Sequence, residues 1–304
     1  MTSDKKSHVY EGGRCVQVSN TMMEATRCQV IAWKRYWMQE STPPEIFLMK
    51  GKGVDKAAEK GFRAGLEGEE VSSKELTEYG VSEFEREVEG ARSAGPIVIE
   101  EEDAVGPDPV AKAKDDLART IPVFWNEVGR KIAPHPGFEP QQTIDTSIKT
   151  PEGTVRLASV LDLVAEEDGA PVVVVDVKTA RKKWPPGKEH ASLQPRLYVF
   201  SVNALSPNQW ENTHTPQKTQ DFRFANVYFN ESRATAEVRP VFVEQKALES
   251  VPKLVRITAN FYTQFAKGQA PLPTGFLSHH FLCNRRYCGY WRFCEQEYGI
   301  RIPE

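Results

Sequence analysis

The stretch PVVVVDVKTARKK, residues 171 to 183, ends a run of four valines with an acid and an amine. Side chains alternate along a strand, so Asp176 and Lys178 should share one face while Val175 and Val177 point to the other. Such a pair suits metal-assisted phosphodiester hydrolysis, in which the carboxylate binds a cation and the amine holds a water or phosphate oxygen. A lone D-x-K is common, however, and is equally compatible with an ordinary ion pair at a strand end.

A second acid, Asp162, lies in the preceding β-type run RLASVLDLV. The turn EEDG should fold the two runs together, and centring the reversal on Asp168 and Gly169 pairs residue 162 with 175 or 176. Directly opposed residues have Cβ atoms about 4.5 to 5.5 Å apart, so two carboxylates there repel unless a cation lies between them. Oxygen ligands favour Mg²⁺ or Mn²⁺.

Two kinds of element must position these residues. From about residue 140 the pattern predicts an antiparallel meander of three strands, followed by a helix at 192–205 and a second hairpin at 222–243. Earlier and later segments predict helices, the first with Thr21 and Glu24 in capping-box spacing, at 19–38, 52–67, 73–91, 109–132 and 244–267. We therefore expect one α/β domain over 1–304, with a mostly helical region at 1–135, a catalytic sheet core at 136–243 and a C-terminal helix and cysteine tail at 244–304.

The order of the motifs ASVLDLV, VVVVDVKTA and QPRLY resembles that of RecB-type nucleases in the PD-(D/E)xK superfamily, over about residues 155 to 200. The resemblance implies a restriction-endonuclease-like core, a mixed sheet flanked by helices. It also implies that Asp162 and Asp176 bind metal, that Lys178 assists the attacking water, and that Gln194 and Tyr198 brace the site. The last two are four residues apart and so share a helix face, as would a polar and an aromatic residue on any buried helix.

An upstream segment, GKGVDKAAEKG, is similar to the family pattern G-x-x-V-H-x-x-x-E, with Asp55 in place of the histidine and Glu59 retained. Asp55 and Glu59 would share one helical face. The third metal ligand is therefore Asp55, Glu59 or, as a weaker candidate, His135. Each of the three is also compatible with an ordinary surface helix or loop.

The chain has five cysteines, an odd number that argues against a disulfide framework. Cys283, Cys288 and Cys294 lie among aromatic residues and arginines in FLCNRRYCGYWRFCEQ. The arrangement resembles the iron–sulfur staple of AddB-type and CRISPR-adaptation nucleases, which implies a 4Fe–4S cluster with Cys28 as the first ligand. Thiolate ligands also suit Zn²⁺, and buried core thiols are a further alternative. Cys15 is left over.

A basic loop, TARKKWPPGK, follows the valine strand directly. Cations around an aromatic side chain suit a nucleic-acid backbone and a stacked base, and a solvated charged surface is the alternative. No sequence-reading motif is present, so little base specificity is expected. The residues concerned are Arg181, Lys182, Lys183, Trp184 and Lys188.

Composition limits the possible partners. The formal net charge is −3 and 39% of the 304 residues are hydrophobic, which indicates a packed protein without a general basic field. No apolar run reaches membrane-spanning length, and MTSDKKSHVYEGG lacks the apolar core of a signal peptide, so we expect a cytoplasmic protein without a membrane partner.

These features together favour a Mg²⁺- or Mn²⁺-dependent DNA exonuclease acting in phage or bacterial recombination, repair or DNA-end processing. The alternatives are a catalytically inactive DNA-binding or assembly module on the same scaffold, and a CRISPR-adaptation nuclease. The sequence has no Walker P-loop, so a helicase or recombination partner would be a separate chain.

Overall fold

The computed structural model describes residues 9–99, 108–167, 170–205, 218–229, 233–271 and 288–299. The chain divides into two compact units. One unit comprises Met1–Thr42, Asp145–Ser159 and Glu249–Glu304, and the other comprises Pro43–Ile144 and Val160–Leu248. The second unit carries Asp162, Asp176 and Lys178. Within the described ranges, no helix combines the length and apolar character needed to cross a bilayer.

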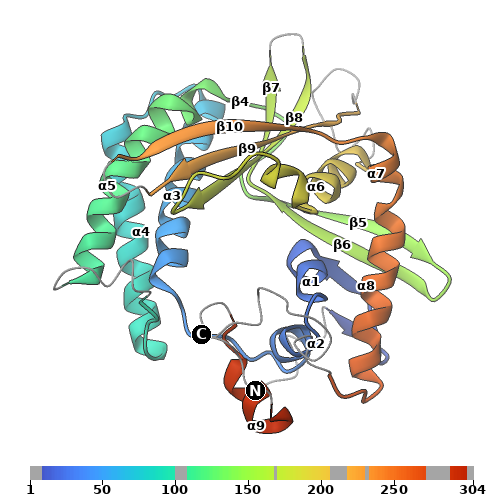
Figure 1. The fold of residues 1–304 in the computed structure, drawn as a ribbon. Coiled ribbons are helices and arrows are strands. Elements are labelled where there is room, and N and C mark those ends of the chain that lie inside the picture. The colour runs from blue at the N-terminus through green and yellow to red at the C-terminus, as the bar shows by residue number, and fades with distance from the viewer. Residues whose placement is uncertain are drawn as a thin grey trace. The chain divides into compact units, whose positions relative to one another are not determined.

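Three long helices of the second unit pack against one another: α3 (Ile46–Glu67), α4 (Ser73–Ala94) and α5 (Pro109–Glu127), shown in Figure 1. Local chemistry explains their ends. Ser72 and Glu75 form a capping box at the start of α4, Asp108 caps α5, and Gly68 ends α3 with a left-handed φ of 73°. The three helices predicted here are confirmed, although α3 starts earlier than predicted and α5 is followed by a short 3-10 turn, Gly129–Lys131.

The five-stranded sheet of the same unit has the order β10-β9-β8-β7-β4. Its strands are β4 (Ala133–Pro134), β7 (Leu163–Glu167), β8 (Ala170–Ala180), β9 (Asp221–Tyr228) and β10 (Thr235–Phe242). The pairs β7–β8 and β9–β10 are antiparallel, whereas β8 and β9 run parallel. The helix α6 (Gln194–Asn203) lies on the connection between these two parallel strands. The predicted mixed sheet flanked by helices is confirmed.

The central strand β8 has two different faces. Val173, Val175 and Val177 belong to the buried hydrophobic cluster that also contains residues of α3, α4 and α5. Asp176 and Lys178 alternate with these valines and so lie on the other face, where α6 contacts the strand. The predicted division of the strand into a valine face and a charged face is confirmed.

The predicted single meander was wrong, because the strand run breaks at Asp162. The strand β6 (Gly153–Leu161) ends before it and belongs to a three-stranded sheet with β3 (Gln17–Ser19) and β5 (Gln142–Thr150), whereas β7 begins after it in the five-stranded sheet. The Asp162 carboxylate accepts the backbone N–H of Val177 at 2.7 Å. A side-chain oxygen thus satisfies a strand N–H that a backbone carbonyl would have taken in an unbroken ladder.

The first unit contains the two-stranded β1 (Tyr10–Glu11) and β2 (Arg14–Cys15), and the helices α1 (Asn20–Ala25), α2 (Gln29–Ala32), a π-helical turn (Trp33–Trp37), α8 (Val251–Ala266) and α9 (Trp291–Tyr298). The predicted helix at 19–38 is interrupted, because Cys28 is extended, and its N-cap is Ser19 rather than Thr21. The predicted helix at 244–267 divides into α7 (Gln245–Glu249) and α8 at Ser250, just before Pro252.

Candidate active site

The two acids predicted to face each other do so. Leu163 pairs with Val175 and Val164 with Val174, and the same register places Asp162 opposite Asp176. Asp176 is 1% exposed, and Asp162 is partly buried. The turn at Asp168 and Gly169 lies outside the described residues. The register shifts between Ala165 and Glu167, and of the two predicted partners of Asp162, 175 and 176, the register beyond this shift selects 176.

Asp176 is held from two sides. The Lys178 ammonium nitrogen lies 2.7 Å from Asp176 Oδ2, and Gln194 Nε2 donates to Asp176 Oδ1 at 2.5 Å. Gln194 begins α6 and is buried, and Tyr198, one turn further along the same helix, is buried against Phe222 at 6.4 Å between ring centroids. Four of the predicted residues therefore come from two neighbouring elements: Asp176 and Lys178 from β8, and Gln194 and Tyr198 from α6.

The charges at this site are not balanced by the protein alone. Burial raises the pKa of Asp176 to about 7; Lys178 opposes this shift, and the Asp162 carboxylate adds to it. Burial also raises the pKa of Asp162, against the effects of Lys178 and the Val177 N–H. Burial would lower the pKa of Lys178, but the two aspartates raise it overall. One ammonium group thus serves two acids, and an added cation would favour the charged form of both.

Asp55 reaches the same site from α3. Burial raises its pKa well above the usual value, and the carboxylates of Asp162 and Asp176 raise it further. These Coulombic effects place the Asp55 carboxylate within electrostatic range of both acids. A third carboxylate, on a helix, therefore lies close enough to interact electrostatically with Asp162 and Asp176.

The other two candidates for the third ligand have different surroundings. Glu59 lies one turn beyond Asp55 and forms ion pairs with Lys56 at 2.7 Å and Arg63 at 3.2 Å. His135 is 4% exposed, accepts the Gly137 N–H at its Nδ1, and has a pKa that burial lowers. Asp55 is therefore the best placed of the three.

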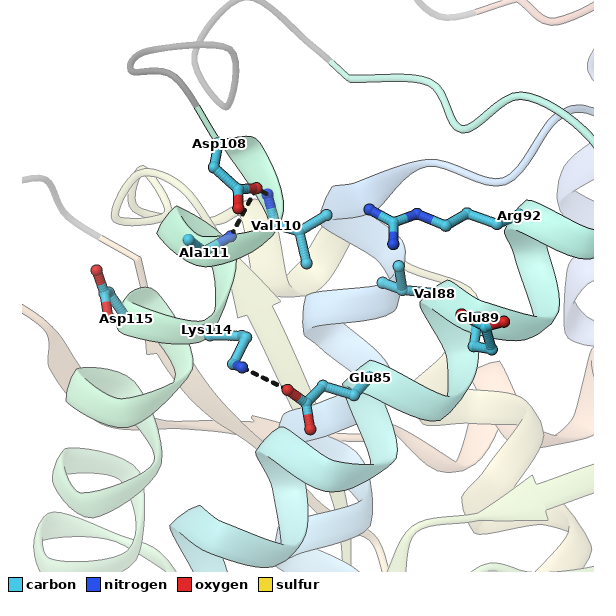
Figure 2. A pocket seen from close by; sticks show the side chains of 9 residues that line it. All are labelled: Glu85, Val88, Glu89, Arg92, Asp108, Val110, Ala111, Lys114 and Asp115. Carbon is cyan, nitrogen blue, oxygen red and sulfur yellow. Dashed lines mark hydrogen bonds and ion pairs between the residues drawn. The ribbon is translucent and has the colours of Figure 1, made fainter.

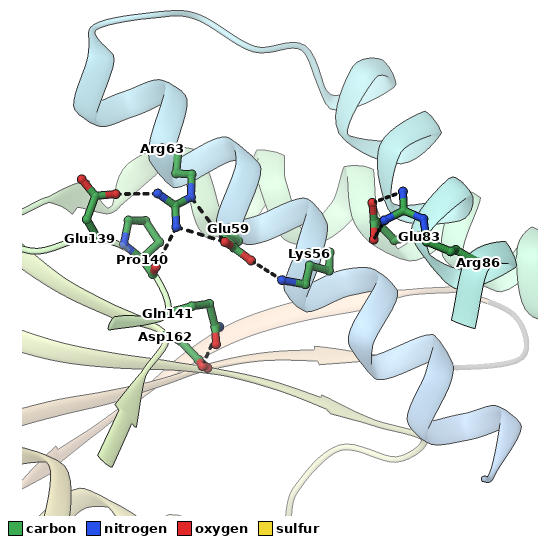
Figure 3. Close-up of polar contacts among 9 residues, drawn as sticks. All are labelled: Lys56, Glu59, Arg63, Glu83, Arg86, Glu139, Pro140, Gln141 and Asp162. Carbon is green, nitrogen blue, oxygen red and sulfur yellow. Dashed lines mark hydrogen bonds and ion pairs between the residues drawn. The ribbon is translucent and has the colours of Figure 1, made fainter. Parts of the chain in front are cut away.

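A cavity of about 240 Å³ has Asp55 and Gln141 in its lining. Figure 3 shows part of its lining, together with the hydrogen bond from Gln141 Nε2 to Asp162 Oδ1 at 2.9 Å. Sequence reasoning missed Gln141, which directly precedes β5 and belongs to no motif. The cavity is lined by Lys52, Asp55, Lys56, Glu59, Glu83, Glu87 and Gln141.

Comparison with protein-family models gives a match to the PD-(D/E)XK nuclease superfamily over residues 28–295. The chain belongs to this superfamily. No curated protein matches it. The mixed sheet flanked by helices is consistent with this membership.

Two solved structures are similar to this PD-(D/E)XK chain. One, named a "putative exonuclease" from Eubacterium rectale, has a TM-score of 0.50 and 13% identity, with 99% of each chain covered. The other, SSO0001, has a TM-score of 0.32 and 13% identity, and the match covers 51% of this chain and 59% of that one. The chain thus spans about three fifths of SSO0001, and at these identities the first likeness supports the fold alone.

The oxygen donors of Asp162 and Asp176 fit a hydrated cation. Among the described residues, no three His, Cys, Asp or Glu side chains are arranged to enclose a metal by themselves. Mg²⁺ usually keeps several waters and takes one or two carboxylates together with substrate phosphates. Asp176 Oδ2 is buried, and the Lys178 ammonium lies 2.7 Å from it. Oxygen donors of this kind suit Mg²⁺ or Mn²⁺.

Three of the candidate cysteines meet in the first unit of this PD-(D/E)XK protein. Cys28, Cys288 and Cys294 are each at most 6% exposed and belong to one buried cluster with Val30 and Tyr290. They are thiols rather than disulfides, as is Cys15. Cys15 stands apart from this cluster and donates its thiol hydrogen to the Gln17 carbonyl at 3.2 Å. Cys283 lies outside the described residues.

The basic loop after β8 is anchored by Arg239 of β10. The guanidinium donates to the carbonyls of Trp184 at 2.7 Å and Pro185 at 3.1 Å, and it forms ion pairs with Glu189 and Glu237. The Trp184 ring packs edge-on against Phe224, with the Lys188 ammonium 4.8 Å from its centroid.

Two members of the predicted DNA surface are already engaged within the protein. Lys183 forms an ion pair with Glu237 at 2.8 Å, and the Arg181 guanidinium lies 4.3 Å from the Phe47 ring centroid. Lys182 is exposed.

A larger cavity lies elsewhere. The space between α4 and α5, about 480 Å³, is lined by residues such as Arg92, Asp108 and Lys114, with an ion pair between Lys114 and Glu85 (Figure 2). None of its lining residues belongs to the carboxylate site. Its size alone does not make it the reactive centre.

Proposed function

We propose that this protein is a Mg²⁺- or Mn²⁺-dependent deoxyribonuclease that degrades DNA from its ends. The observation that carries the proposal is the opposed pair of Asp162 and Asp176, with the Lys178 ammonium 2.7 Å from Asp176. Membership of the PD-(D/E)XK nuclease superfamily supports hydrolysis of a nucleic-acid backbone. The similar structure from Eubacterium rectale, which is named a "putative exonuclease", is the reason for proposing attack at ends.

In this proposal Asp162, Asp176 and Asp55 would hold the cation, which when bound lowers the pKa of a water and neutralises charge on the scissile phosphate. Lys178 would donate from its ammonium to the attacking water or to a phosphate oxygen, exchanging that contact with its present one to Asp176. Gln194 would keep Asp176 in place through its 2.5 Å hydrogen bond, and Tyr198 would fix the helix that carries Gln194. Glu59 would act indirectly, since Lys56 and Arg63 already neutralise it.

The proposed DNA path runs over the loop that follows β8. Lys182 and Lys188 would contact phosphates. The Arg239 contacts would hold the loop in one conformation, so that less conformational entropy is lost when DNA binds. A role in recombination, repair or end processing, with a helicase on a separate chain, is the biological setting we propose for this activity.

We also propose that Cys28, Cys288 and Cys294 bind metal together with Cys283, as a 4Fe–4S cluster or a Zn²⁺ site. Their common burial supports this, although the three described thiols are not yet arranged as a metal site. Iron and sulfide analysis of protein prepared without oxygen separates the two metals. A protein with neither metal, in which Cys294→Ser leaves the melting temperature unchanged, would contradict the proposal.

The nuclease proposal is tested with linear and circular DNA, labelled at either end, in Mg²⁺, Mn²⁺ or EDTA. We expect metal-dependent release of nucleotides from linear DNA, no cleavage of circles, and no activity in Asp176→Ala. Asp145→Ala, which removes an exposed carboxylate of β5, is the matched control and should retain activity. An Asp176→Ala protein as active as the parent would overturn the proposal, and a parent that binds DNA without cleaving it would favour a DNA-binding module.

A further inference from the structure

One residue near the carboxylates has an unfavourable backbone. Gln141 has a φ of 61°, in the left-handed region that residues with a side chain rarely adopt. Gln39, with a φ of 59°, is the other such non-glycine residue in the described part of the chain. A strained conformation of this kind persists only where the surrounding contacts hold it, so the contacts of Gln141 identify what the strain serves.

Gln141 binds Asp162 twice. Its backbone N–H donates to the Asp162 carbonyl at 3.1 Å, and its side-chain amide donates to Asp162 Oδ1 at 2.9 Å. The other carboxylate oxygen of Asp162 accepts the Val177 N–H. Both oxygens therefore have a fixed donor, and each keeps one lone pair, so the carboxylate has a single orientation toward Asp176.

The turn that carries Gln141 is also bound to α3, the helix that carries Asp55. Arg63 of α3 donates to Glu139 at 2.5 Å and to the Pro140 carbonyl at 3.2 Å, and the same guanidinium pairs with Glu59 (Figure 3). The contacts run without a break from α3 through Arg63 to the turn, and through Gln141 to Asp162.

We infer that Gln141 is a positioning residue that sets the Asp162 carboxylate for metal binding and, through Arg63, fixes its placement relative to α3. The inference rests on the proposed function, because it assumes that Asp162 is a metal ligand. Partners that orient a ligand in this way typically contribute about 10- to 100-fold to metal affinity or activity. Gln141 contacts the ligand rather than the reacting atoms, so its loss should weaken metal binding more than DNA binding.

The test compares three variants of the full chain. Gln141→Gly removes the amide and relieves the left-handed strain, Gln141→Asn tolerates the same φ but has a side chain one carbon shorter, and Gln39→Gly relieves the same strain far from this contact in the sequence. Mn²⁺ binding is measured by electron paramagnetic resonance without DNA, alongside melting in EDTA, DNA binding and cleavage.

We expect Gln141→Gly and Gln141→Asn to bind Mn²⁺ at least about tenfold more weakly and to need correspondingly more metal for cleavage. Melting in EDTA should not fall for Gln141→Gly, and Gln39→Gly should match the parent in metal binding and cleavage. If Gln141→Asn, or a folded Gln141→Gly, binds Mn²⁺ as tightly as the parent, the inference is wrong while the nuclease proposal stands. A parent that binds Mn²⁺ but never cleaves DNA instead defeats the proposed function and leaves the Gln141 comparison valid.

Discussion

The Asp162 carboxylate accepts the backbone N–H of Val177, the residue between Asp176 and Lys178, at 2.7 Å. Asp162 is thus fixed directly to the backbone of β8, the strand that carries Asp176. This contact adds to the pairing of β7 with β8. Movement of Asp162 away from Asp176 would leave a buried strand N–H without an acceptor, which costs free energy. The spacing of the carboxylates is therefore part of the fold.

The proposed role of Lys178 can be tested in a variant that keeps all the candidate metal-binding carboxylates. We expect Lys178→Met, which keeps most of the side-chain length, to retain metal and DNA binding but to lower the rate of cleavage about 10²- to 10³-fold, because an ammonium aimed at developing charge contributes about that much. Single-turnover cleavage with bound DNA measures the rate directly. Lys149→Met, at an exposed position of β5, is the control. A parental single-turnover rate in Lys178→Met would exclude the proposed role.

The raised pKa of Asp176 predicts how the metal-free protein responds to pH. Its pKa is about 7 in the folded protein, against about 3.9 in an unfolded chain. The folded state therefore binds the extra proton between these values, and the free energy of unfolding should fall as pH rises from about 4 to about 7, by at most about 1.4 kcal/mol per unit. Above pH 7 this contribution is constant.

Asp176→Asn should remove that contribution. In urea unfolding with EDTA present, we expect the variant to gain stability relative to the parent as pH increases from 5 to 7, with no further gain at pH 8. Parallel stability curves for the two proteins across this range would show that Asp176 is charged in the fold at all these pH values.

The basic loop predicts unequal effects of two adjacent lysines. Lys182→Ala should weaken DNA binding for all sequences alike and lower the slope of log affinity against log salt by about one, because a phosphate contact is lost. Lys183→Ala should change that slope less, since Glu237 already partners this ammonium at 2.8 Å. Fluorescence anisotropy at several salt concentrations measures both, with Lys74→Ala on α4 as the control. An unchanged slope for Lys182→Ala would place the DNA elsewhere.

Two glycines let α3 and α4 approach closely. A Cβ at Gly80 would lie 2.7 Å from the Gly53 carbonyl oxygen and 2.5 Å from Ile121 Cδ1, whereas a Cβ at Gly90 of the same helix would meet nothing within 4 Å. We expect Gly80→Ala to lower the free energy of unfolding by about 1 to 3 kcal/mol, and Gly90→Ala to raise it by about 0.5 to 1 kcal/mol.

Chemical denaturation of both variants measures these changes. Because Gly53 is two residues from Asp55, Gly80→Ala should also weaken Mn²⁺ binding, and Gly90→Ala should not. Equal stability of the two alanine variants would mean that the helices separate at little cost.

The sequence alone was enough to predict those parts of the site that depend on local periodicity. Alternation along residues 171–180 placed Asp176 and Lys178 on one face, and a turn centred on Asp168 and Gly169 predicted that residue 162 pairs with 175 or 176. The register shift between Ala165 and Glu167, which the sequence did not predict, selects 176. Both predictions follow from the period of two in a strand and from the length of the turn. The helix of Asp55 was likewise evident from its composition.

Other features depend on contacts that no local pattern specifies. The break at Asp162 follows from its side chain accepting the Val177 N–H, which requires the folded pair of strands. Gln141 is recognised only by its φ and its partner, and both arise from tertiary contacts. The anchoring of the basic loop by Arg239 likewise joins residues more than 50 positions apart.

The parallel pairing of β8 with β9 also has a kinetic consequence. Parallel strands cannot be joined by a tight hairpin, so β8 and β9 meet only when the ends of a long connection that contains α6 come together. Gln194, which holds Asp176, lies on that connection. We therefore expect the contact of Asp162 with Val177 to form early, with the local β7–β8 pair, and the contact of Gln194 with Asp176 to form only after the longer connection has closed.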